Sequence, residues 1–324
     1  MHCTLFSTAA LALLATTATA FPFTVPTRRI SKAIDVNFPD PAIIKEGNTW
    51  YAFGTNDHGR NVQVASSVDF RKWTVLDVDA MPSVGAWVDS RSPNIWPPDV
   101  VRNAAGDYIL YYSARHPSSD QHCIGAAISK QITGPFAPFP HPVACPLARG
   151  GAIDASGFHD TADGERYIVY KVDGNSIGHG GSCRNTVNPI VPTPIMLQQV
   201  AADGHTKTGL PIEILNRGDL DGPLVEAPSM MRTAEGKYVL FFSSNCYSTE
   251  FYDLSYAMAD SIAGPYTKYG PLAVTGTAGL RAPGGASIAE DGVHMAFHAT
   301  GKDGRRSMYT TTIVVDAAKH VVYG

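Results

Sequence analysis

The sequence predicts an all-β protein, a five-bladed β-propeller, from three observations. Helical periodicity is nearly absent along the 324 residues. Short runs rich in Val, Ile, Tyr and Phe alternate with clusters of Gly, Pro, Asn and Asp, which is typical of strands joined by turns. One strand–turn–strand unit recurs five times at a spacing of roughly 55–70 residues, and this repeat favours a propeller over a sandwich.

Each unit begins with a short strand, passes through a turn that contains Gly or Asp, and returns in a second strand. In the first unit, residues 41–44 lead through the turn at 46–48 into residues 49–55. The second strands of the later units are expected at residues 107–114, 166–172, 237–244 and 293–300. A third run follows, with a turn such as Gly-Pro-Phe at 134–136 or Gly-Pro-Tyr at 264–266. One blade per unit predicts a single domain over residues 31–324.

The N-terminus predicts export. Residues 1–20 have a short apolar core and end in Ala-Thr-Ala, which is typical of a signal peptide cleaved after Ala20. The Arg28-Arg29 pair suggests a second, dibasic cleavage, so residues 21–30 are expected to form a short propeptide or linker. No other segment of the sequence approaches a membrane-spanning length. We therefore expect a secreted, extracellular protein.

Composition limits the classes of partner. The chain is 44% hydrophobic and 17% charged, as is ordinary for a soluble globular protein. Its formal charge of −4 and its pI of about 6.2 argue against nucleic acid or an anionic membrane as the partner.

Four cysteines remain once Cys3 leaves with the signal peptide: Cys123, Cys145, Cys183 and Cys246. An even number in an exported chain predicts two disulfides, and three pairings are possible. The spacings resemble no zinc site.

Acids stand just before the first strand of several units. Asp40 lies between two prolines in the first unit, and residues 96–99, Trp-Pro-Pro-Asp, open the second. Asp154 opens the third unit and Glu226 the fourth, whereas residues 282–285 of the fifth contain no acid. Because the first strand of each propeller blade is innermost, we expect these acids to converge on one axial pocket.

Converging carboxyl groups can hydrolyse a glycosidic bond. One carboxylic acid protonates the leaving oxygen, and an ionised partner activates water or attacks the sugar. A third carboxyl group can raise the pKa of the acid by like-charge repulsion. Aromatic side chains could supply faces for sugar rings, although most are expected in the core. The candidates are Trp73, Trp87, Trp96, Phe158, Tyr247 and Phe251.

Taken in order and at propeller spacing, these motifs resemble the glycoside hydrolases of family 43 over essentially the whole chain after the signal. The matching segments are Asp40-Pro41, residues 96–100, Ile153-Asp154, residues 226–229 and the Gly-Pro-Phe and Gly-Pro-Tyr turns. The resemblance implies that Asp40 is the general base, Glu226 the general acid, and Asp154 the group that tunes and orients Glu226. It also implies inversion at the anomeric carbon, with a carboxylate separation of roughly 6.5–9.5 Å.

The resemblance suggests further site residues. Trp96 resembles a residue that borders the sugar subsite, and Asp99 is expected to hold a hydrogen bond between blades. From its place in the sequence, Phe158 is a further candidate for substrate binding. Arg281, just before the fifth inner strand, could contact a sugar hydroxyl or have a surface role. His298 matches a family histidine that can bind calcium or its water shell, with a satisfied core histidine as the alternative. No cofactor is implied for the chemistry, and a structural Ca²⁺ in the channel is the one metal suggested. Two departures weaken local details: Ala155 stands where the family often has Pro, and residues 281–287 lack a His that often follows Gly.

The resemblance also orders the substrates. Family members remove α-L-arabinofuranose or β-D-xylose or cut arabinan internally. Many of the β-xylosidases carry an accessory β-sandwich, which is not expected here because the fifth unit ends close to residue 324. We therefore expect a monomeric exo-acting α-L-arabinofuranosidase acting on plant cell-wall polysaccharide, with β-xylosidase and endo-1,5-α-L-arabinanase as alternatives. Fructoside-active propellers would need an Asn-Asp-Pro-Asn-Gly opening and a Glu-Cys motif, whereas Phe38-Pro39 precedes Asp40 and Ala227 follows Glu226. A non-catalytic carbohydrate-binding propeller is the alternative from another class.

Overall fold

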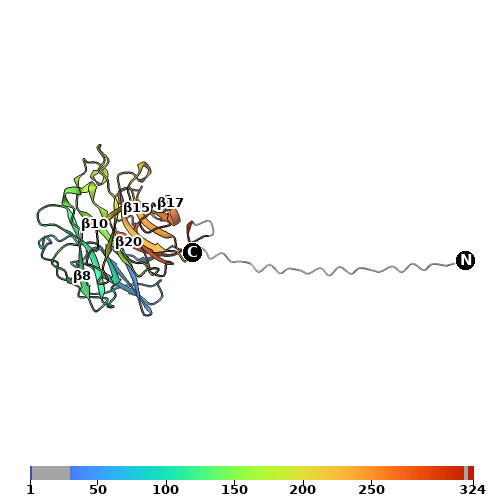
Figure 1. Ribbon diagram of the computed structural model, residues 1–324, viewed down its shortest axis with the longest axis horizontal. Helices are drawn as coiled ribbons and strands as arrows, with labels where there is room; N and C mark the ends of the chain where they lie inside the picture. The colour runs from blue at the N-terminus through green and yellow to red at the C-terminus, as the bar shows by residue number, and fades with distance from the viewer. Residues whose placement is uncertain (2–29, 317–319) are drawn as a thin grey trace.

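Five antiparallel sheets stand around one axis in the computed structural model, which describes residue 1, residues 30–316 and residues 320–324 (Figure 1). The five-bladed propeller expected from the sequence is therefore confirmed. The expected signal peptide and nearly all of the expected propeptide lie outside the described residues. Within the described part, helical structure is limited to short 3₁₀ turns, and none of them is long and apolar enough to cross a membrane. These turns are η1 (Leu147–Arg149), η2 (Gly174–Ile177), η3 (Ser182–Arg184), η4 (Asp219–Asp221) and η5 (Thr277–Gly279).

Four blades are built from consecutive strands, each paired with the next. Blade one contains β2 (Ala42–Glu46), β3 (Thr49–Gly54), β4 (Gln63–Ser67) and β5 (Thr74–Val75). Blade two contains β6 (Trp96–Arg102), β7 (Tyr108–Arg115), β8 (His122–Ser129) and β9 (Ala137–Pro138). Blade three contains β10 (Ala152–His159), β11 (Arg166–Val172), β12 (Ile195–Val200) and β13 (Ile212–Leu215). Blade four contains β14 (Val225–Arg232), β15 (Tyr238–Ser244), β16 (Asp253–Ala259) and β17 (Thr267–Ala273).

The fifth blade joins the two ends of the chain. It contains β18 (Gly284–Ile288), β19 (His294–Thr300) and β20 (Arg306–Val315), and its fourth strand is the N-terminal β1 (Ser31–Ile34). β1 pairs with the first half of β20, and β21 (Val321–Tyr323) pairs with its second half. The ring is therefore closed by backbone hydrogen bonds between residues almost 280 positions apart, a closure that the repeat pattern alone does not reveal.

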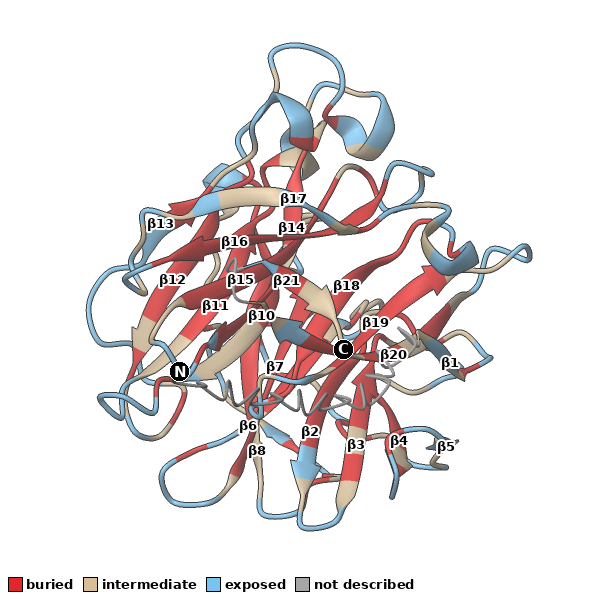
Figure 2. Ribbon diagram, turned by 90° about the vertical axis from the view of Figure 1, so that its right-hand side faces the viewer, coloured by how far each residue is buried: buried red, intermediate tan, exposed pale blue. Residues whose placement is uncertain are grey.

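Apolar side chains fill the spaces between neighbouring sheets. Five clusters of buried residues lie between blades one and two, two and three, three and four, four and five, and five and one. Figure 2 shows the consequence, since the middle of most strands is buried and exposure concentrates in the connections. Each sheet is covered on both faces, which explains why the central strands read as almost continuous apolar runs.

The inner strands share an unusual backbone conformation where they meet the channel. Asp40, Asp154, Ala227 and Gly285 have φ values of 53°, 61°, 51° and 59°, in the left-handed region. In four blades the strand pairing also shifts register at this point, between Trp96 and Asp99, Ile153 and Ser156, Glu226 and Ser229, and Gly284 and Ser287. Such a bulge redirects side chains, and here it turns them toward the axis.

Side chains of neighbouring blades stabilise these bulges. The N–H of Asp40 donates to Nδ1 of His298 (3.2 Å), that of Asp154 to Oγ of Ser113 (3.1 Å), and that of Gly285 to Oγ of Ser243 (2.9 Å). A second layer lies deeper: Gly157 N–H donates to Oδ2 of Asp99 (2.7 Å), Ile288 N–H to Ser229 Oγ and Ile43 N–H to Ser287 Oγ (3.1 Å each). The hydrogen bond between blades expected for Asp99 is thus confirmed.

The structure also selects one of the three possible disulfide pairings. Cys123 is bonded to Cys145 within blade two, and Cys183 is bonded to Cys246. The second bond joins the loop after β11 to the loop after β15, so it ties blade three to blade four.

The closing strand offers a test of this architecture. Ile34 is 5% exposed and packs in the cluster between blades five and one. Ile34→Ala should therefore lower the free energy of unfolding by about 2–5 kcal/mol, measured by urea denaturation. Lys32→Ala, in the same strand but exposed and in a surface ion pair with Asp35, should cost less than about 1 kcal/mol. Equal effects of the two substitutions would contradict the described closure.

Candidate active site

The inner strands line a channel that opens into a pocket at one end. Along β10, Ile153 and Asp154 line the pocket, Asp154 to Ser156 line the narrow channel, and Ser156 to His159 line a second cavity at the far end. Blades one, two and four repeat this order, whereas the inner strand of blade five lines only the channel and the far cavity. The pocket has a volume of about 370 Å³ and contains Asp40, Asp154 and Glu226. The folded chain therefore brings together the three predicted acids, which are separated by up to 186 positions in sequence.

The three acids do not occupy equivalent positions in their blades. Asp40 and Asp154 themselves occupy the left-handed position of the inner strand. In blade four Ala227 occupies it, so Glu226 stands one residue earlier. Because the bulge turns successive side chains in different directions, this offset gives Glu226 a different approach to the pocket from those of the two aspartates.

Asp40 is a partly buried carboxylate surrounded by polar partners. Thr55 Oγ1 donates to Oδ2 (2.6 Å), and Nη1 of Arg306 lies 3.0 Å from Oδ1 and 3.3 Å from Oδ2. Nδ1 of His298 is 3.2 Å from Oδ1 as well as from the backbone nitrogen. Burial alone would raise the pKa of Asp40, but the Arg306 guanidinium, His298 and Thr55 outweigh it and hold the pKa well below its usual range. Asp40 is therefore ionised across the physiological range.

Asp154 and Glu226 form a second, contrasting environment. Both are buried, and Oδ2 of Asp154 accepts a hydrogen bond from the N–H of Ala227 (2.9 Å), next to Glu226. Burial and the neighbouring Glu226 carboxyl group raise the pKa of Asp154 well above its usual range, although Lys171 opposes the shift. Two carboxyl groups that share one site titrate as a pair. The pair therefore keeps a proton at a pH where an exposed carboxyl group has lost its own.

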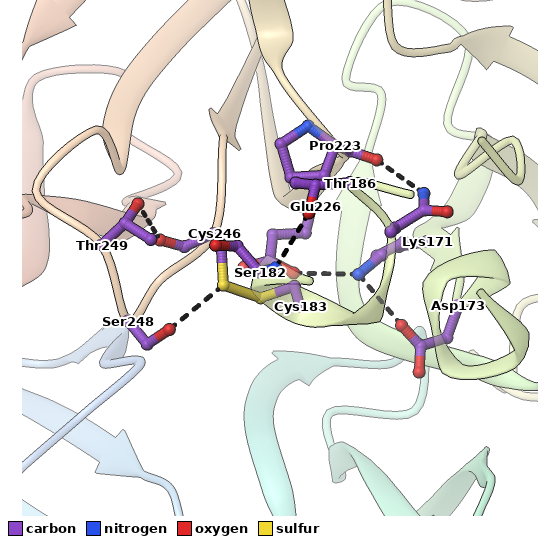
Figure 3. The surroundings of a disulfide bond; sticks show 11 residues. Lys171, Asp173, Ser182, Cys183, Thr186, Pro223, Glu226, Cys246, Ser248 and Thr249 are labelled. Atoms are coloured by element: carbon purple, nitrogen blue, oxygen red, sulfur yellow. Dashed lines mark hydrogen bonds and ion pairs between the residues drawn. A yellow bond between two sulfur atoms is a disulfide. The ribbon is translucent and has the colours of Figure 1, made fainter. Parts of the chain in front are cut away.

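Lys171 is the buried cation of this site. Its side chain is fully buried, and Nζ lies 2.9 Å from Oε2 of Glu226 and 3.0 Å from Oδ1 of Asp173 (Figure 3). Burial would lower the pKa of Lys171, but Glu226, Asp173 and Asp154 outweigh it and hold the pKa above its usual range. Lys171 is therefore a permanent positive charge that fixes the Glu226 carboxyl group and offsets part of the buried negative charge.

The Cys183–Cys246 disulfide lies beside Lys171 and Glu226 in the same wall of the site (Figure 3). Asn185 stabilises this wall, because its Nδ2 donates to the carbonyl oxygens of Val191 (2.9 Å) and Pro223 (2.7 Å). The pocket-lining residues Cys183, Arg184 and Tyr247 belong to the loops that this disulfide joins. The bond therefore holds a wall of the pocket rather than the propeller core.

Aromatic rings stand at two places around the pocket. Trp96 is 36% exposed and stacks on His122, with ring centroids 3.7 Å apart and an interplanar angle of 17°. The guanidinium of Arg306 lies 5.3 Å from the ring centroid of Tyr247, which links the partner of Asp40 to the loop of Cys246. Trp96 thus lines the pocket that contains the three acids, and its contact with a sugar stays a prediction.

Two of the predicted binding residues lie elsewhere. Phe158 lines the cavity at the far end of the channel and packs edge-on against Tyr238, because it stands four residues beyond Asp154 along β10. Arg281 does not line the pocket, and it pairs with Glu250 on the surface (3.2 Å). The structure therefore does not bring either side chain to the three acids.

His298 lies against Asp40 rather than in a metal cluster. It is 1% exposed, and burial lowers its pKa despite the neighbouring Asp40 carboxylate. Its Nε2 has no hydrogen-bond partner. Among the described residues no group of three His, Cys, Asp or Glu side chains could hold a metal ion. Calcium bound through His298 or its water shell therefore stays a prediction, and no catalytic step depends on it.

Several residues of the pocket were not singled out from the sequence, among them Lys171, Arg306 and His122. Lys171 did carry a signal, since it is the one charge inside the apolar second strand of its unit, residues 167–172. Arg306 begins β20 and reaches Asp40 across 266 positions, and His122 begins β8 directly after a turn, so neither had a local pattern. Only the closed ring brings them to the acids.

Comparison with known proteins agrees with this geometry. The family described as Glycosyl hydrolases family 43 matches residues 33–317. An extracellular endo-α-(1→5)-L-arabinanase of Thermotoga petrophila is 34% identical over 110 residues, or 30% of this chain and 22% of the relative. Another, from Bacillus subtilis, is 27% identical over 70% of this chain and 66% of its own length. An extracellular exo-α-(1→5)-L-arabinofuranosidase of Cellvibrio japonicus is 31% identical over 32% of this chain and 28% of its own length.

These alignments cover less than two thirds of each of these relatives. Solved structures share the fold over more of the chain. The crystal structure of a thermostable family-43 glycoside hydrolase has a TM-score of 0.73 at 24% identity and covers 90% of this chain and 95% of that one. Native Bacillus subtilis arabinanase has a TM-score of 0.68 at 24% identity, over 90% and 99%.

Removing the buried cation should destabilise the protein. Lys171→Met leaves Glu226 and Asp173 buried without their counterion, so the free energy of unfolding should fall by about 3–5 kcal/mol. Lys237→Met breaks a more exposed pair with Asp260 and should cost less than about 1 kcal/mol. Urea denaturation of both variants measures the difference, and a loss below 1 kcal/mol for Lys171→Met would show that the buried acids need no cation.

The raised pKa of Asp154 makes a second, pH-dependent prediction. Some carboxyl groups, such as Asp154, have a higher pKa in the folded than in the unfolded protein. Such a group opposes folding increasingly as the pH rises above its pKa in the unfolded protein. Asp154→Asn removes this penalty and keeps an oxygen for the N–H of Ala227. The stability advantage of the variant over the wild type should therefore grow from pH 4 to pH 7, as measured by urea unfolding at both pH values. A gain that shrinks with rising pH would contradict the assignment.

Proposed function

This chain belongs to the glycosyl hydrolases of family 43, and from that premise we propose that it is a secreted, inverting α-L-arabinofuranosidase acting on plant cell-wall arabinan or arabinoxylan. The observation that carries the proposal is the contrast between the acids of one pocket. Arg306 keeps Asp40 ionised, whereas burial and mutual repulsion keep a proton on the Asp154–Glu226 pair. A base and an acid in one sugar-sized pocket are what glycoside hydrolysis requires.

The proposed mechanism assigns one role to each acid. Asp40 accepts a proton from a water molecule as that water attacks the anomeric carbon. Glu226 donates its proton to the leaving glycosidic oxygen, so the proton of the pair must be on Glu226 when the bond breaks. Asp154 keeps the proton available by repulsion, and Lys171 holds the Glu226 side chain in place. Because water attacks directly, the product has inverted configuration.

Arabinose specificity is supported by the names of the relatives. Both the arabinanases and the arabinofuranosidase that this chain resembles act on α-(1→5)-L-arabinosyl linkages by name. Secretion is supported by the two disulfides and by relatives that are named extracellular. Two of the three relatives named above are called endo-arabinanases, which favours internal cleavage of arabinan as a second candidate.

A substrate panel tests this function. The enzyme should hydrolyse 4-nitrophenyl α-L-arabinofuranoside much faster than 4-nitrophenyl β-D-xyloside, and it should release arabinose alone from linear 1,5-α-L-arabinan. Proton NMR of the first product should show the inverted anomer. Oligosaccharides of mixed length would instead establish the endo-arabinanase. Carbohydrate binding without turnover of any substrate would favour a binding propeller.

Substitution of the two catalytic acids tests their separate roles. Asp40→Asn should lower kcat by about 10²–10⁴-fold on every substrate, because no group then activates water. Glu226→Gln should cause a similar loss with arabinan, but a much smaller loss with a 2,4-dinitrophenyl arabinofuranoside, whose leaving group needs no proton. Asp77→Asn, which changes an exposed acid, is the matched control. The same leaving-group dependence in both variants would refute the assignment.

A further inference from the structure

One wall of the catalytic pocket lies between blades two and three, outside the ring of inner strands. His122 begins β8, Asp173 directly follows β11, and Asn175 lies in η2. β8 and β11 are the third and second strands of their blades, so these residues are farther from the axis than Asp154 on the inner strand β10. A backbone bridge between His122 and Gly151 brings the two blades together here. All three side chains line the same pocket as the acids.

This wall gathers buried polar atoms that lack hydrogen-bond partners. In the described part of the chain these atoms include Nε2 of His122, Oδ1 of Asp173 and Oδ1 of Asn175. Asp173 Oδ1 is 3.0 Å from Lys171 Nζ but makes no well-aligned hydrogen bond. Buried polar atoms are almost always hydrogen-bonded to protein or to ordered water. These three atoms belong to residues that line one pocket, where a bound molecule can supply the partners.

The three atoms can act as acceptors. The His122 ring bonds to the backbone of Asn94, and burial lowers its pKa to about 4, so the ring is neutral above that pH. Since Nε2 has no partner, the proton given to Asn94 must come from Nδ1, and Nε2 keeps a free lone pair. Asp173 and Asn175 present oxygens. Three acceptors on one wall suit a ligand with several hydroxyl donors.

Two neighbours place this wall relative to the bond that breaks. Lys171 contacts both Asp173 and Glu226, so the wall adjoins the proposed general acid. Asp40, the proposed base, belongs to blade one. The general acid protonates the leaving oxygen, and the sugar that departs lies on its side. Trp96, held by its stack on His122, adds an aromatic surface for a sugar ring.

We propose that His122, Asp173 and Asn175 form a hydroxyl-binding subsite for the leaving-group sugar. This proposal rests on the proposed glycosidase function. It adds that the enzyme prefers a sugar to an aryl group on the leaving side of the bond. The three acceptors receive hydrogen bonds from hydroxyl groups of that sugar, and Trp96 contacts its apolar face. The inner strands then perform the chemistry, while blades two and three select the leaving group.

Two substitutions remove acceptors without touching the acids. Asn175→Ala deletes one oxygen, and His122→Phe removes Nε2 while keeping an aromatic ring under Trp96. Each should lower kcat/KM for 1,5-α-L-arabinotriose about 3- to 10-fold, the effect of one neutral hydrogen bond. With 4-nitrophenyl α-L-arabinofuranoside, which has no hydroxyl groups on the leaving side, kcat/KM should change less than 2-fold. His141→Phe, an exposed histidine outside the pocket, should change neither.

The two substrates separate the possible outcomes. Equal losses on both would overturn the proposal and assign the residues a structural role or a role at the acids. Unchanged values on both would overturn it as well. A wild type that cleaves xylosides instead would refute the arabinose specificity alone. In that case xylobiose and 4-nitrophenyl β-D-xyloside replace the two substrates, and the same selective loss is required for the subsite.

Discussion

Three carboxyl groups share the mouth of one channel, and the electrostatic repulsion among them is the constraint that the surrounding structure satisfies. Buried charges need partners, and two cations supply them: Arg306 contacts Asp40, and Lys171 contacts Glu226. Asp154 has Lys171 only as a more distant neighbour, and its pKa rises accordingly. The position of two cations therefore separates the acids into one that is always ionised and a pair that keeps a proton.

The propeller makes this arrangement possible at the expense of local backbone strain. Asp40 and Asp154 adopt left-handed conformations that are unfavourable for residues with a Cβ atom, and His298 and Ser113 of neighbouring blades hold them there. The same conformation recurs at Ala227 and Gly285, where no acid is present. The bulge therefore belongs to the blade as a structural unit, and the active site uses a geometry that the fold repeats.

The site has two parts with different structural origins. The acids stand on inner strands, whose positions are set by the closed ring and by the five cores between blades. The walls stand on strand ends and on connections between strands, and the Cys183–Cys246 disulfide, Asn185 and the Trp96–His122 stack hold them. Rigid strands suit the chemistry, which requires fixed distances, whereas connections can change without disturbing the cores. Substrate preference is therefore expected to depend on the walls.

The sequence by itself determined the five-bladed fold and the three acids, because strand runs, turns and Asp-Pro-like segments are local patterns that recur with the blades. It could not determine the closing strand β1, the disulfide pairing, or the contacts of Arg306 and Lys171, since each joins segments that no local pattern relates. Phe158 and Arg281 were expected near the acids, yet the strand direction and a surface ion pair place them elsewhere. Local chemistry thus identified which residues could react. Only the tertiary structure decided their neighbours, and with them their charge, because burial and distance set the pKa of a carboxyl group.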